Sequence, residues 1–306
     1  MPVQALVTEP QADSATPYTR RARYHCAENG FAFAWPAVPV RQFLAERDRA
    51  FDKATPTGLI VLDSSSALGT AYPATTPTLL VCYLKLRASE QLRTRLEASG
   101  EIYYVYAGSG ESRTGADALQ WQAGDVFCLP GGGETTHRAH TQDALLVVAT
   151  NAPLLAFEGL QPPRPGHARV QVTHWPGAEI ERHFEAVWRR PITANTTGHS
   201  VAFTSTALQS TVTIPTINCA INSLAPGYDQ RPHRHNGVAV TLAIQGEGVY
   251  SMIDGQRVDW SQGAAQITPA TALHSHHNRG HQRMRSLIFQ DEGLHYYTRT
   301  PGFSFD

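Results

Sequence analysis

The chain has 306 residues, of which 42% are hydrophobic and 17% are charged, and its formal net charge is -1. This composition excludes a disordered chain, and the near-zero charge does not favour nucleic acid or an anionic membrane as a partner. The length exceeds the size at which one hydrophobic core usually stops growing, so it predicts two domains. The four cysteines, Cys26, Cys82, Cys128 and Cys219, are widely spaced without a CxxC pair, so we expect reduced thiols in the core.

Residues 1–75 are predicted to form an N-terminal arm followed by a helix. The N-terminal sequence has no apolar stretch long enough for a signal peptide, and no run in the chain approaches the ~18 apolar residues of a membrane span. Residues 40–54, VRQFLAERDRAFDKA, place apolar side chains at helical spacing. We therefore expect a cytoplasmic protein with a helix before its first β domain.

The chain contains an internal repeat. The segment TPTLLVCYLKLR, from residue 76, aligns with IPTINCAINSLA, from residue 214, and Pro77 matches Pro215 at an offset of 138. Short apolar or alternating runs such as IYYVYAG and VAVTLAIQG, separated by Gly, Pro and Asp-Gly turns, are typical of β-strands. We therefore predict an all-β protein with two tandem barrels, residues 76–158 and 201–306, joined by a linker and a helix at 159–200.

The second copy carries two histidines one residue apart, His233 and His235. Successive side chains of a strand point to opposite faces, so both histidines lie on one face, which suits a single metal ion. Without further support, such a pair is more often two surface histidines before a buried strand. Here the pattern continues at fixed intervals through Gly227, Gly246, Gly263, Pro269, His274 and Asn278.

This spacing resembles the two motifs of the cupin superfamily, G-x5-HxH-x(3,4)-E-x6-G and G-x5-P-x-G-x2-H-x3-N. The resemblance implies two tandem cupin barrels, which are double-stranded β-helices of the jelly-roll type. Ala239 stands where the motif has a glutamate ligand, and Thr271 stands where it has a glycine. The remaining ligands are His233, His235 and His274, and neutral imidazoles with open positions suit Fe(II), with Zn, Ni or Mn as alternatives.

The segments PHRHNGVAVTLAIQGEGVYSMIDGQRV and ITPATALHSHHNRG are similar to the metal-binding barrel of gentisate, salicylate and 1-hydroxy-2-naphthoate 1,2-dioxygenases. Those bicupin enzymes cleave aromatic rings with three histidines on ferrous iron, which they carry in the first barrel. The resemblance implies catalytic roles for His276, in contact with substrate, and for Asp291. Thr241 stands where these enzymes have the arginine that binds the substrate carboxylate, so we expect it in the substrate-binding wall and expect a substrate other than gentisate or salicylate.

Two arginines are candidates to replace the missing cation. Arg283 and Arg285 share strand parity with Asp291, so in a regular strand all three would face the barrel interior and bind substrate. Alternatively, a bulge before Asp291 reverses the phase and both arginines point outward.

The first copy lacks the three histidines. Arg95, Glu97 and Thr135 occupy their places, so we predict a degenerate barrel without metal. His137 aligns with His276, and we expect it to be structural.

Together these features predict a mononuclear iron(II) dioxygenase that cleaves a ring or a C–C bond of a chelating aromatic or enolic substrate. Three neutral ligands leave the ion its +2 charge, which attracts an anionic bidentate group. The alternatives are a non-oxidative metal-dependent cupin, namely an isomerase, lyase or hydrolase, and a metal-dependent binding protein. The expected partners are a small-molecule substrate and O2, without nucleic acid or membrane, in a homo-dimer or homo-tetramer that covers exposed sheet edges.

Overall fold

The computed structural model describes residues 16–22, 35–193, 196–208 and 211–306. The chain divides into two units, Met1–Ala37 and Val38–Asp306. The described part of the first unit contains a short 3-10 helix, η2 (Thr19–Arg21), and most of the predicted arm, with Cys26, lies outside the described residues. Among the described residues, no helix has both the length and the apolar character needed to cross a membrane.

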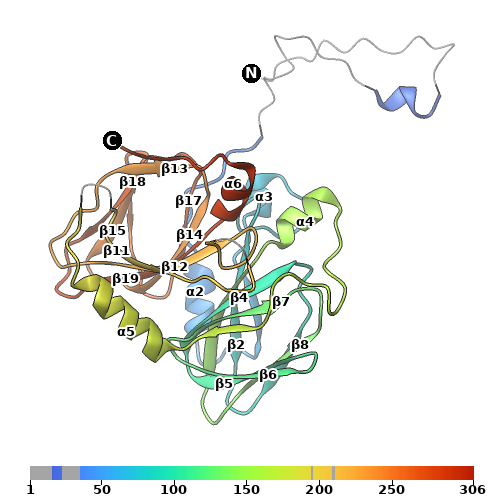
Figure 1. The fold of residues 1–306 in the computed structure, drawn as a ribbon, viewed down its shortest axis with the longest axis horizontal. Helices are drawn as coiled ribbons and strands as arrows, with labels where there is room; N and C mark the ends of the chain where they lie inside the picture. Colours follow the sequence, from blue (N-terminus) through green and yellow to red (C-terminus); the bar gives the residue numbers. More distant parts are fainter. Residues whose placement is uncertain (1–15, 23–34, 194–195, 209–210) are drawn as a thin grey trace. The chain divides into compact units, whose positions relative to one another are not determined.

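The first barrel consists of two antiparallel sheets, drawn in blue to green in Figure 1. The larger sheet has the order β1-β2-β9-β4-β7-β10, and the smaller sheet has the order β3-β8-β5-β6. The strands are β1 (Gly58–Val61), β2 (Leu80–Leu86), β3 (Gln91–Thr94), β4 (Gly100–Ala107), β5 (Ser109–Thr114), β6 (Asp117–Gln122), β7 (Val126–Pro130), β8 (Thr135–Ala139), β9 (Ala144–Thr150) and β10 (Thr173–Trp175).

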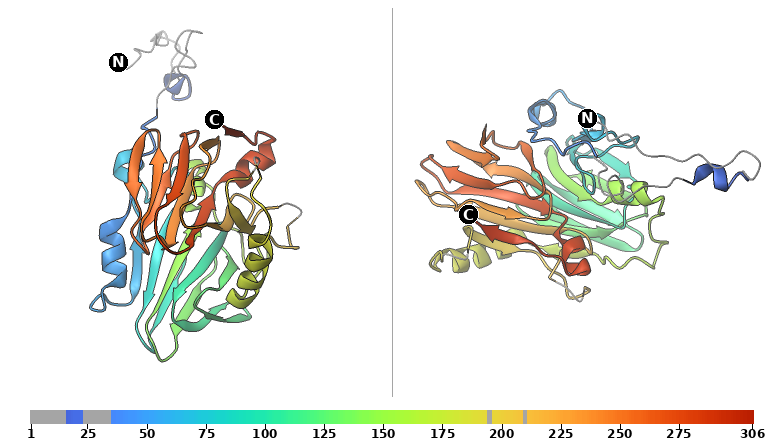
Figure 2. Two further views of the ribbon diagram at one scale, coloured as in Figure 1. Left: turned by 90° about the vertical axis from the view of Figure 1, so that its left-hand side faces the viewer. Right: turned by 90° about the horizontal axis from the view of Figure 1, so that it is seen from above.

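The second barrel repeats this plan. Its sheets have the orders β11-β12-β19-β14-β17 and β16-β15-β18-β13-β20. Figure 2 shows these strands, mostly orange to red, as a group separate from the strands of the first barrel. The strands are β11 (His199–Ala202), β12 (Asn218–Leu224), β13 (His233–His235), β14 (Ala239–Gln245), β15 (Val249–Ile253), β16 (Gln256–Asp259), β17 (Ala265–Thr268), β18 (His274–Asn278), β19 (Met284–Gln290) and β20 (Phe303–Phe305).

Short helices flank the sheets. The helix expected over 40–54 is α2 (Leu44–Phe51), which contacts β1 and β2, and the helix expected before the second barrel is α5 (Gly177–Trp188), which contacts β11. The others are α3 (Ser65–Leu68), α4 (Ala152–Glu158) and α6 (Glu292–Thr298).

The prediction of an all-β fold with two tandem cupin-like barrels is confirmed. The structure also adds strands to the first barrel from segments expected to flank it. Strand β1 comes from the predicted N-terminal part and pairs with β2, and β10 comes from the predicted linker and pairs with β7. The two additions widen the sheet that faces the second barrel.

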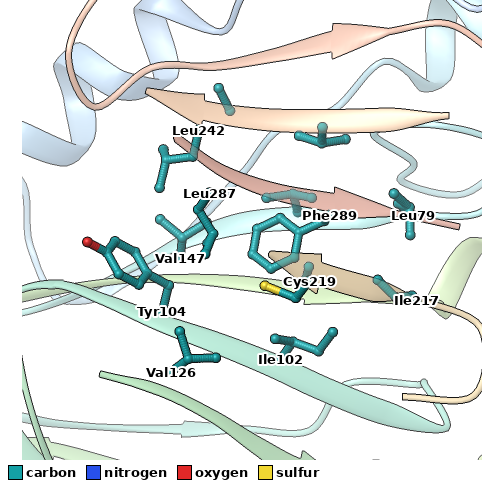
Figure 3. Packing of buried hydrophobic residues seen from close by; sticks show 14 of the residues in the cluster. Leu79, Ile102, Tyr104, Val126, Val147, Ile217, Cys219, Leu242, Leu287 and Phe289 are labelled. Carbon is teal, nitrogen blue, oxygen red and sulfur yellow. The ribbon is translucent and has the colours of Figure 1, made fainter. Parts of the chain in front are cut away.

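The larger sheets of the two barrels pack face to face through an apolar core. In Figure 3, Ile102 and Tyr104 of β4 lie opposite Leu287 and Phe289 of β19. All four side chains are at least 94% buried, so this contact joins the barrels into one folded unit. The described cysteines, Cys82, Cys128 and Cys219, are free and buried, as the sequence predicted.

The interiors of the two barrels differ. The first is filled by apolar and aromatic side chains from both of its sheets, including Leu84, Tyr103 and Leu129. At the repeat-related positions, the second barrel has small or polar side chains, namely Asn222, Thr241 and Thr268. Because these side chains leave space that the larger ones fill, the second barrel contains a pocket where the first contains a core.

Candidate metal centre

Three buried histidines meet inside the second barrel. His233 and His235 lie on one face of β13, and His274 is the direct cross-strand partner of His233 on β18. Each side chain is no more than 6% exposed, and one ring nitrogen from each lies within 4.8 Å of the other two. Within the described residues this is the only such group of three metal-binding side chains.

Backbone carbonyls fix the tautomer of each ring. Nδ1 of His233 contacts the Arg231 carbonyl at 3.0 Å, Nδ1 of His235 the Gly237 carbonyl at 2.7 Å, and Nδ1 of His274 the Ala272 carbonyl at 2.9 Å. A carbonyl only accepts, so each Nδ1 carries the proton and donates it. Each Nε2 therefore keeps its lone pair, and the His235 Nε2 accepts a hydrogen bond from the amide of Gln290 at 3.1 Å.

The environment keeps the three rings neutral. Burial lowers the pKa of His233 to about 4 and that of His274 to about 2, and burial also lowers the pKa of His235. A histidine binds a metal ion in its neutral form, so at neutral pH the three rings can bind an ion without first releasing a proton. Three neutral Nε2 donors facing one pocket fit a transition-metal ion and leave open positions on it.

A fourth histidine lies beside this group with its own hydrogen-bond network. His276 is two residues beyond His274 on the same face of β18, and their ring centroids are 6.1 Å apart. Its Nδ1 lies 2.8 Å from Ser251 Oγ. The same oxygen accepts hydrogen bonds from Trp260 Nε1 at 2.8 Å and from Gln266 Nε2 at 2.7 Å. With both lone pairs engaged, the hydroxyl donates to Nδ1, so the proton of His276 is on Nε2. His276 can thus donate a hydrogen bond into the pocket.

The first barrel repeats this network without the metal-binding group. Ser112 Oγ lies 2.8 Å from His137 Nδ1 and accepts from Trp121 Nε1 at 2.9 Å. The Nε2 of His137 faces the hydroxyl of Tyr103 at 3.3 Å, and that hydroxyl donates to Glu101 Oε2 at 2.5 Å. Tyr103, which aligns with Thr241 of the second barrel, therefore contacts the Nε2 of His137 in the first barrel.

The residues that replace the three histidines in the first barrel do not come together as a group. Arg95 and Glu97 form an exposed ion pair with Nε and Oε1 3.5 Å apart, and Thr135 is buried. Arg95 and Glu97 project into solvent rather than toward His137.

The pocket of the second barrel has a volume of about 240 Å³. Besides the four histidines its walls are formed largely by uncharged polar groups, including Asn222, Thr241, Thr268 and Gln290. Among its described lining residues, Glu292 is the one acidic side chain and there is no lysine or arginine. Thr241 lies in the wall, as expected from the sequence.

The structure corrects the expected placement of the two arginines. Arg283 Nη1 pairs with Glu185 Oε1 at 2.6 Å and its guanidinium lies over Trp188, while Arg285 Nη2 pairs with Glu181 Oε1 at 2.7 Å. All three partners belong to α5, on the face of β19 opposite to the pocket. The two arginines and Asp291 do have the same strand parity, as expected. The pocket, however, is lined by the residues of opposite parity on β19, namely Ile288 and Gln290.

Asp291 likewise lies outside the lining of the pocket and links the two barrels. Its Oδ1 accepts from the Val238 N–H at 2.7 Å and its Oδ2 accepts from Thr78 Oγ1, also at 2.7 Å. Burial raises the pKa of this carboxyl group. Asp291 precedes α6, so these bonds fix the start of the helix that carries Glu292 into the pocket.

The C-terminal segment covers one side of the histidine group. Strand β20 pairs with β13, and the ring of Phe303 stacks on His233 with centroids 5.1 Å apart. Asn236 holds this segment through its N–H to the Gly302 carbonyl at 2.9 Å and through Nδ2 to the Thr300 carbonyl at 2.8 Å. A Cβ on Gly302 would lie 2.3 Å from Asn236 Oδ1, which explains the glycine.

Thr271 adopts the backbone that the cupin motif assigns to glycine. Its φ is 63°, in the left-handed region that a β-branched side chain disfavours. Its N–H donates to the carbonyl of His235 at 2.8 Å, and its own carbonyl accepts from Arg234 Nη1 at 2.9 Å. These two hydrogen bonds tie the turn before β18 to β13, and the turn keeps its left-handed backbone although it has no glycine at this position.

Several residues of the site were not identified from the sequence. Ser251 and Trp260, which support His276 from outside the pocket lining, could have been found, because they recur 139 residues after Ser112 and Trp121. Glu292 and Phe303 carry no such signal, because they reach the pocket through the docking of α6 and β20.

Comparisons with known proteins agree with this site. Residues 221–289 match the family profile described as "Cupin domain". A gentisate 1,2-dioxygenase from Ralstonia sp is 35% identical over 74 residues, which are 24% of this chain and 21% of that protein. A 5-aminosalicylate 1,2-dioxygenase from Comamonas sp is 30% identical over 86 residues, 28% of this chain and 23% of that protein. The matched segments thus span about a fifth of the length of these curated relatives.

Solved structures match over most of the chain. Salicylate 1,2-dioxygenase from Pseudaminobacter salicylatoxidans superimposes with a TM-score of 0.73, covering 90% of this chain and 91% of that chain at 13% identity. A cupin 2 conserved barrel domain protein from Leptotrichia buccalis matches with a TM-score of 0.51 and 14% identity, covering 84% of this chain and 99% of that chain. At these identities the likeness shows the fold, and it confirms the resemblance to bicupin proteins.

Proposed function

We propose that this chain, with a cupin domain at residues 221–289 and the two-barrel fold of salicylate 1,2-dioxygenase, is a mononuclear iron(II) dioxygenase that acts on a chelating aromatic or enolic substrate. The observation that carries the proposal is the set of three neutral Nε2 donors within one polar pocket. The curated relatives that share this segment are named as gentisate and 5-aminosalicylate 1,2-dioxygenases, which supports ring cleavage.

The three histidines would hold the ion. His233, His235 and His274 contribute no charge, so an iron(II) ion keeps its +2 charge and attracts a chelating oxygen anion. Ferrous iron supplies redox chemistry with O2, whereas zinc has none, and for this reason iron fits the proposed reaction better than zinc.

The chain's own residues orient the substrate. His276, with its proton on Nε2, donates a hydrogen bond to a substrate oxygen and holds the ring in register with the open side of the metal-binding group. Phe303 and Tyr296 line the pocket and would exclude water from one side of the bound ring. Asp291 contributes as a positioning residue, because it fixes α6 through Val238 and Thr78.

Reconstitution with different metals tests the proposal. Apoprotein loaded under argon with Fe(II), Zn(II), Ni(II) or Mn(II) is given a hydroxyaryl carbonyl compound and then O2. We expect O2 uptake with stoichiometric ring opening in the iron-loaded protein. Equal turnover by the zinc-loaded protein under argon would instead indicate a non-oxidative metal-dependent cupin.

We also propose a homo-oligomer, and we propose the two-barrel division expected from the sequence with β1 and β10 added to the first barrel. Strands β16, β6 and β20 are edge strands of their sheets, and association of copies is a common way to cover such edges. Light scattering at micromolar concentration tests this, and a monomer would contradict it.

A further inference from the structure

We infer that the substrate of this pocket carries no carboxylate and binds as a hydroxy-carbonyl chelator, such as a hydroxyaryl ketone. This inference rests on the proposed function and specifies its substrate class. Its basis is the charge of the pocket wall, together with one buried hydroxyl group that has no partner.

The wall offers nothing to neutralise a carboxylate. Among the described lining residues, every polar group apart from the histidines and Glu292 is an uncharged amide or hydroxyl. Arg285 of the pocket strand β19 and Arg283 just before it are paired with α5 on the opposite face of the strand. Position 241, which lines the pocket, is a threonine that is 2% exposed.

Glu292 makes the wall unfavourable to a second anion. Its side chain is 7% exposed and lines the pocket, and its Oε1 accepts from the Gly237 N–H at 3.3 Å. A carboxylate chelator that also ionises its hydroxyl brings two negative charges to the ion, whereas a hydroxy-ketone brings one. With the +2 ion and an ionised Glu292 in the pocket, the singly charged ketone brings the sum of charges to zero, whereas the dianion leaves one negative charge. No lysine or arginine lines the pocket to offset that charge, so it costs free energy of desolvation and of repulsion by Glu292.

The wall does offer a neutral hydrogen bond. Thr268 is 1% exposed, lines the pocket, and its Oγ1 has no hydrogen-bond partner in the structure. A buried hydroxyl without a partner is unfavourable, so a ligand oxygen or hydroxyl within its reach gains affinity. Asn222 and Thr241 line the same pocket and are likewise uncharged. The wall therefore matches a ring substituted with hydroxyl or carbonyl groups.

A matched pair of chelators tests the inference without turnover. Gentisate and 2,5-dihydroxyacetophenone share the ring and both hydroxyls and differ by a carboxylate against an acetyl group. Dissociation constants of both chelators are measured by calorimetry on the iron(II)-loaded protein under argon. Each is divided by the dissociation constant of the same chelator from free Fe(II) in solution. We expect the normalised affinity of the ketone to exceed that of gentisate by roughly tenfold or more. Equal or tighter normalised binding of gentisate would overturn the inference.

Three variants identify the cause of the preference. Glu292→Gln keeps the acceptor for the Gly237 N–H and removes the charge, so the preference for the ketone should shrink. Thr241→Arg should shift it toward gentisate, and Thr241→Gln, of similar length without charge, should not. Because Glu292→Gln is conservative, it decides the matter even if the arginine variant does not fold. An unchanged ratio in Glu292→Gln would contradict the role of the acidic wall.

Admission of O2 separates this inference from the proposed function. If the ketone binds preferentially and no O2 is consumed with it or with gentisate, the dioxygenase proposal fails and the pocket selectivity stands. If gentisate binds better and is cleaved with uptake of O2, the selectivity fails and the dioxygenase proposal stands.

Discussion

Ser251 Oγ lies 2.8 Å from His276 Nδ1, and Ser112 Oγ lies at the same distance from His137 Nδ1 in the first barrel. The serine–histidine contact thus occurs in both barrels, although only one of them carries the three-histidine group. In the second barrel Gln266 adds a donor to the serine, whereas the repeat-related residue of the first barrel is Phe127. The contact is therefore part of the shared fold, and the second barrel uses it to direct Nε2–H of His276 into a pocket.

Ser251→Ala should weaken chelator binding, because the His276 ring then loses the donor that fixes its tautomer. Ser112→Ala is the matched control, since it removes the same contact in the barrel without a pocket. Both variants should lose stability, by about 1 to 3 kcal/mol for each buried donor left without an acceptor. Calorimetric titration of the iron-loaded variants should show a rise in the chelator dissociation constant for Ser251→Ala only. The same rise in Ser112→Ala would mean that the effect is one of general stability.

His274→Ala should abolish metal binding while the chain stays folded. The wild-type chain is expected to retain about one metal ion after gel filtration, because only the second barrel has ligands. His277→Ala is the control, since His277 follows on the same strand but pairs with Asp229 Oδ1 at 2.7 Å outside the group. Metal content is measured by mass spectrometry and folding by circular dichroism. Full occupancy in His274→Ala, or two ions in the wild type, would refute the ligand set.

Glu101→Gln should change the pH dependence of stability. Burial raises the pKa of Glu101 from 4.5 to about 7. Between these two pH values the carboxyl group is ionised in the unfolded chain and protonated in the folded chain. The free energy of unfolding therefore falls as the pH rises from 4.5 to about 7. The loss is on the order of 3 kcal/mol at pH 8. Glutamine keeps an acceptor for Tyr103 and cannot ionise. The difference in the free energy of unfolding, variant minus wild type, should therefore be more positive at pH 8 than at pH 5.

Chemical denaturation at these two pH values measures the effect. The exposed Glu97→Gln serves as the control and should show no such difference between the two pH values. If the free energy difference between Glu101→Gln and wild type is the same at pH 5 and pH 8, the buried carboxyl group does not titrate as described.

Thr271→Gly should stabilise the protein. The positive φ of 63° is unfavourable for threonine and neutral for glycine, while the hydrogen bond from its N–H to the His235 carbonyl does not depend on the side chain. The relief of strain exceeds the added flexibility of the unfolded chain, for a net gain of about 1 kcal/mol. Thermal unfolding measures it. The neighbouring Ala272→Gly has no positive φ to relieve and should lower the melting temperature.

The sequence could predict the ligand group because its signal is a spacing. Two histidines on one strand face and a third after a glycine-proline turn come together in any barrel with this motif, and the repeat reveals the barrels themselves. The orientation of β19 could not be predicted in the same way. Leu287 and Phe289 on one face and Ile288 on the other are all buried, so both faces of the strand look like a core. Parity alone then cannot tell which face lines the pocket, so the sequence leaves the orientation of Arg283 and Arg285 open between the two faces.

Contacts between segments that are far apart in the chain could not be predicted from the sequence either. Phe303 reaches His233 because β20 adds to the edge of β13, a pairing between residues about seventy positions apart that leaves no local pattern. Asp291 was expected in the site, yet its carboxylate bonds to Thr78 of the other barrel. Such a contact depends on how the two barrels dock.

The most direct test of the proposed dioxygenase activity is the fate of O2 in the iron-loaded protein. Protein reconstituted with Fe(II) under argon is mixed with 2,5-dihydroxyacetophenone and ¹⁸O2, and the product is analysed by mass spectrometry. We expect a ring-opened product that contains both atoms of ¹⁸O2, formed by wild type and His277→Ala but not by His274→Ala. A product without ¹⁸O, or the same product from His274→Ala, would contradict the claim that the three-histidine group of the second barrel supports a dioxygenase.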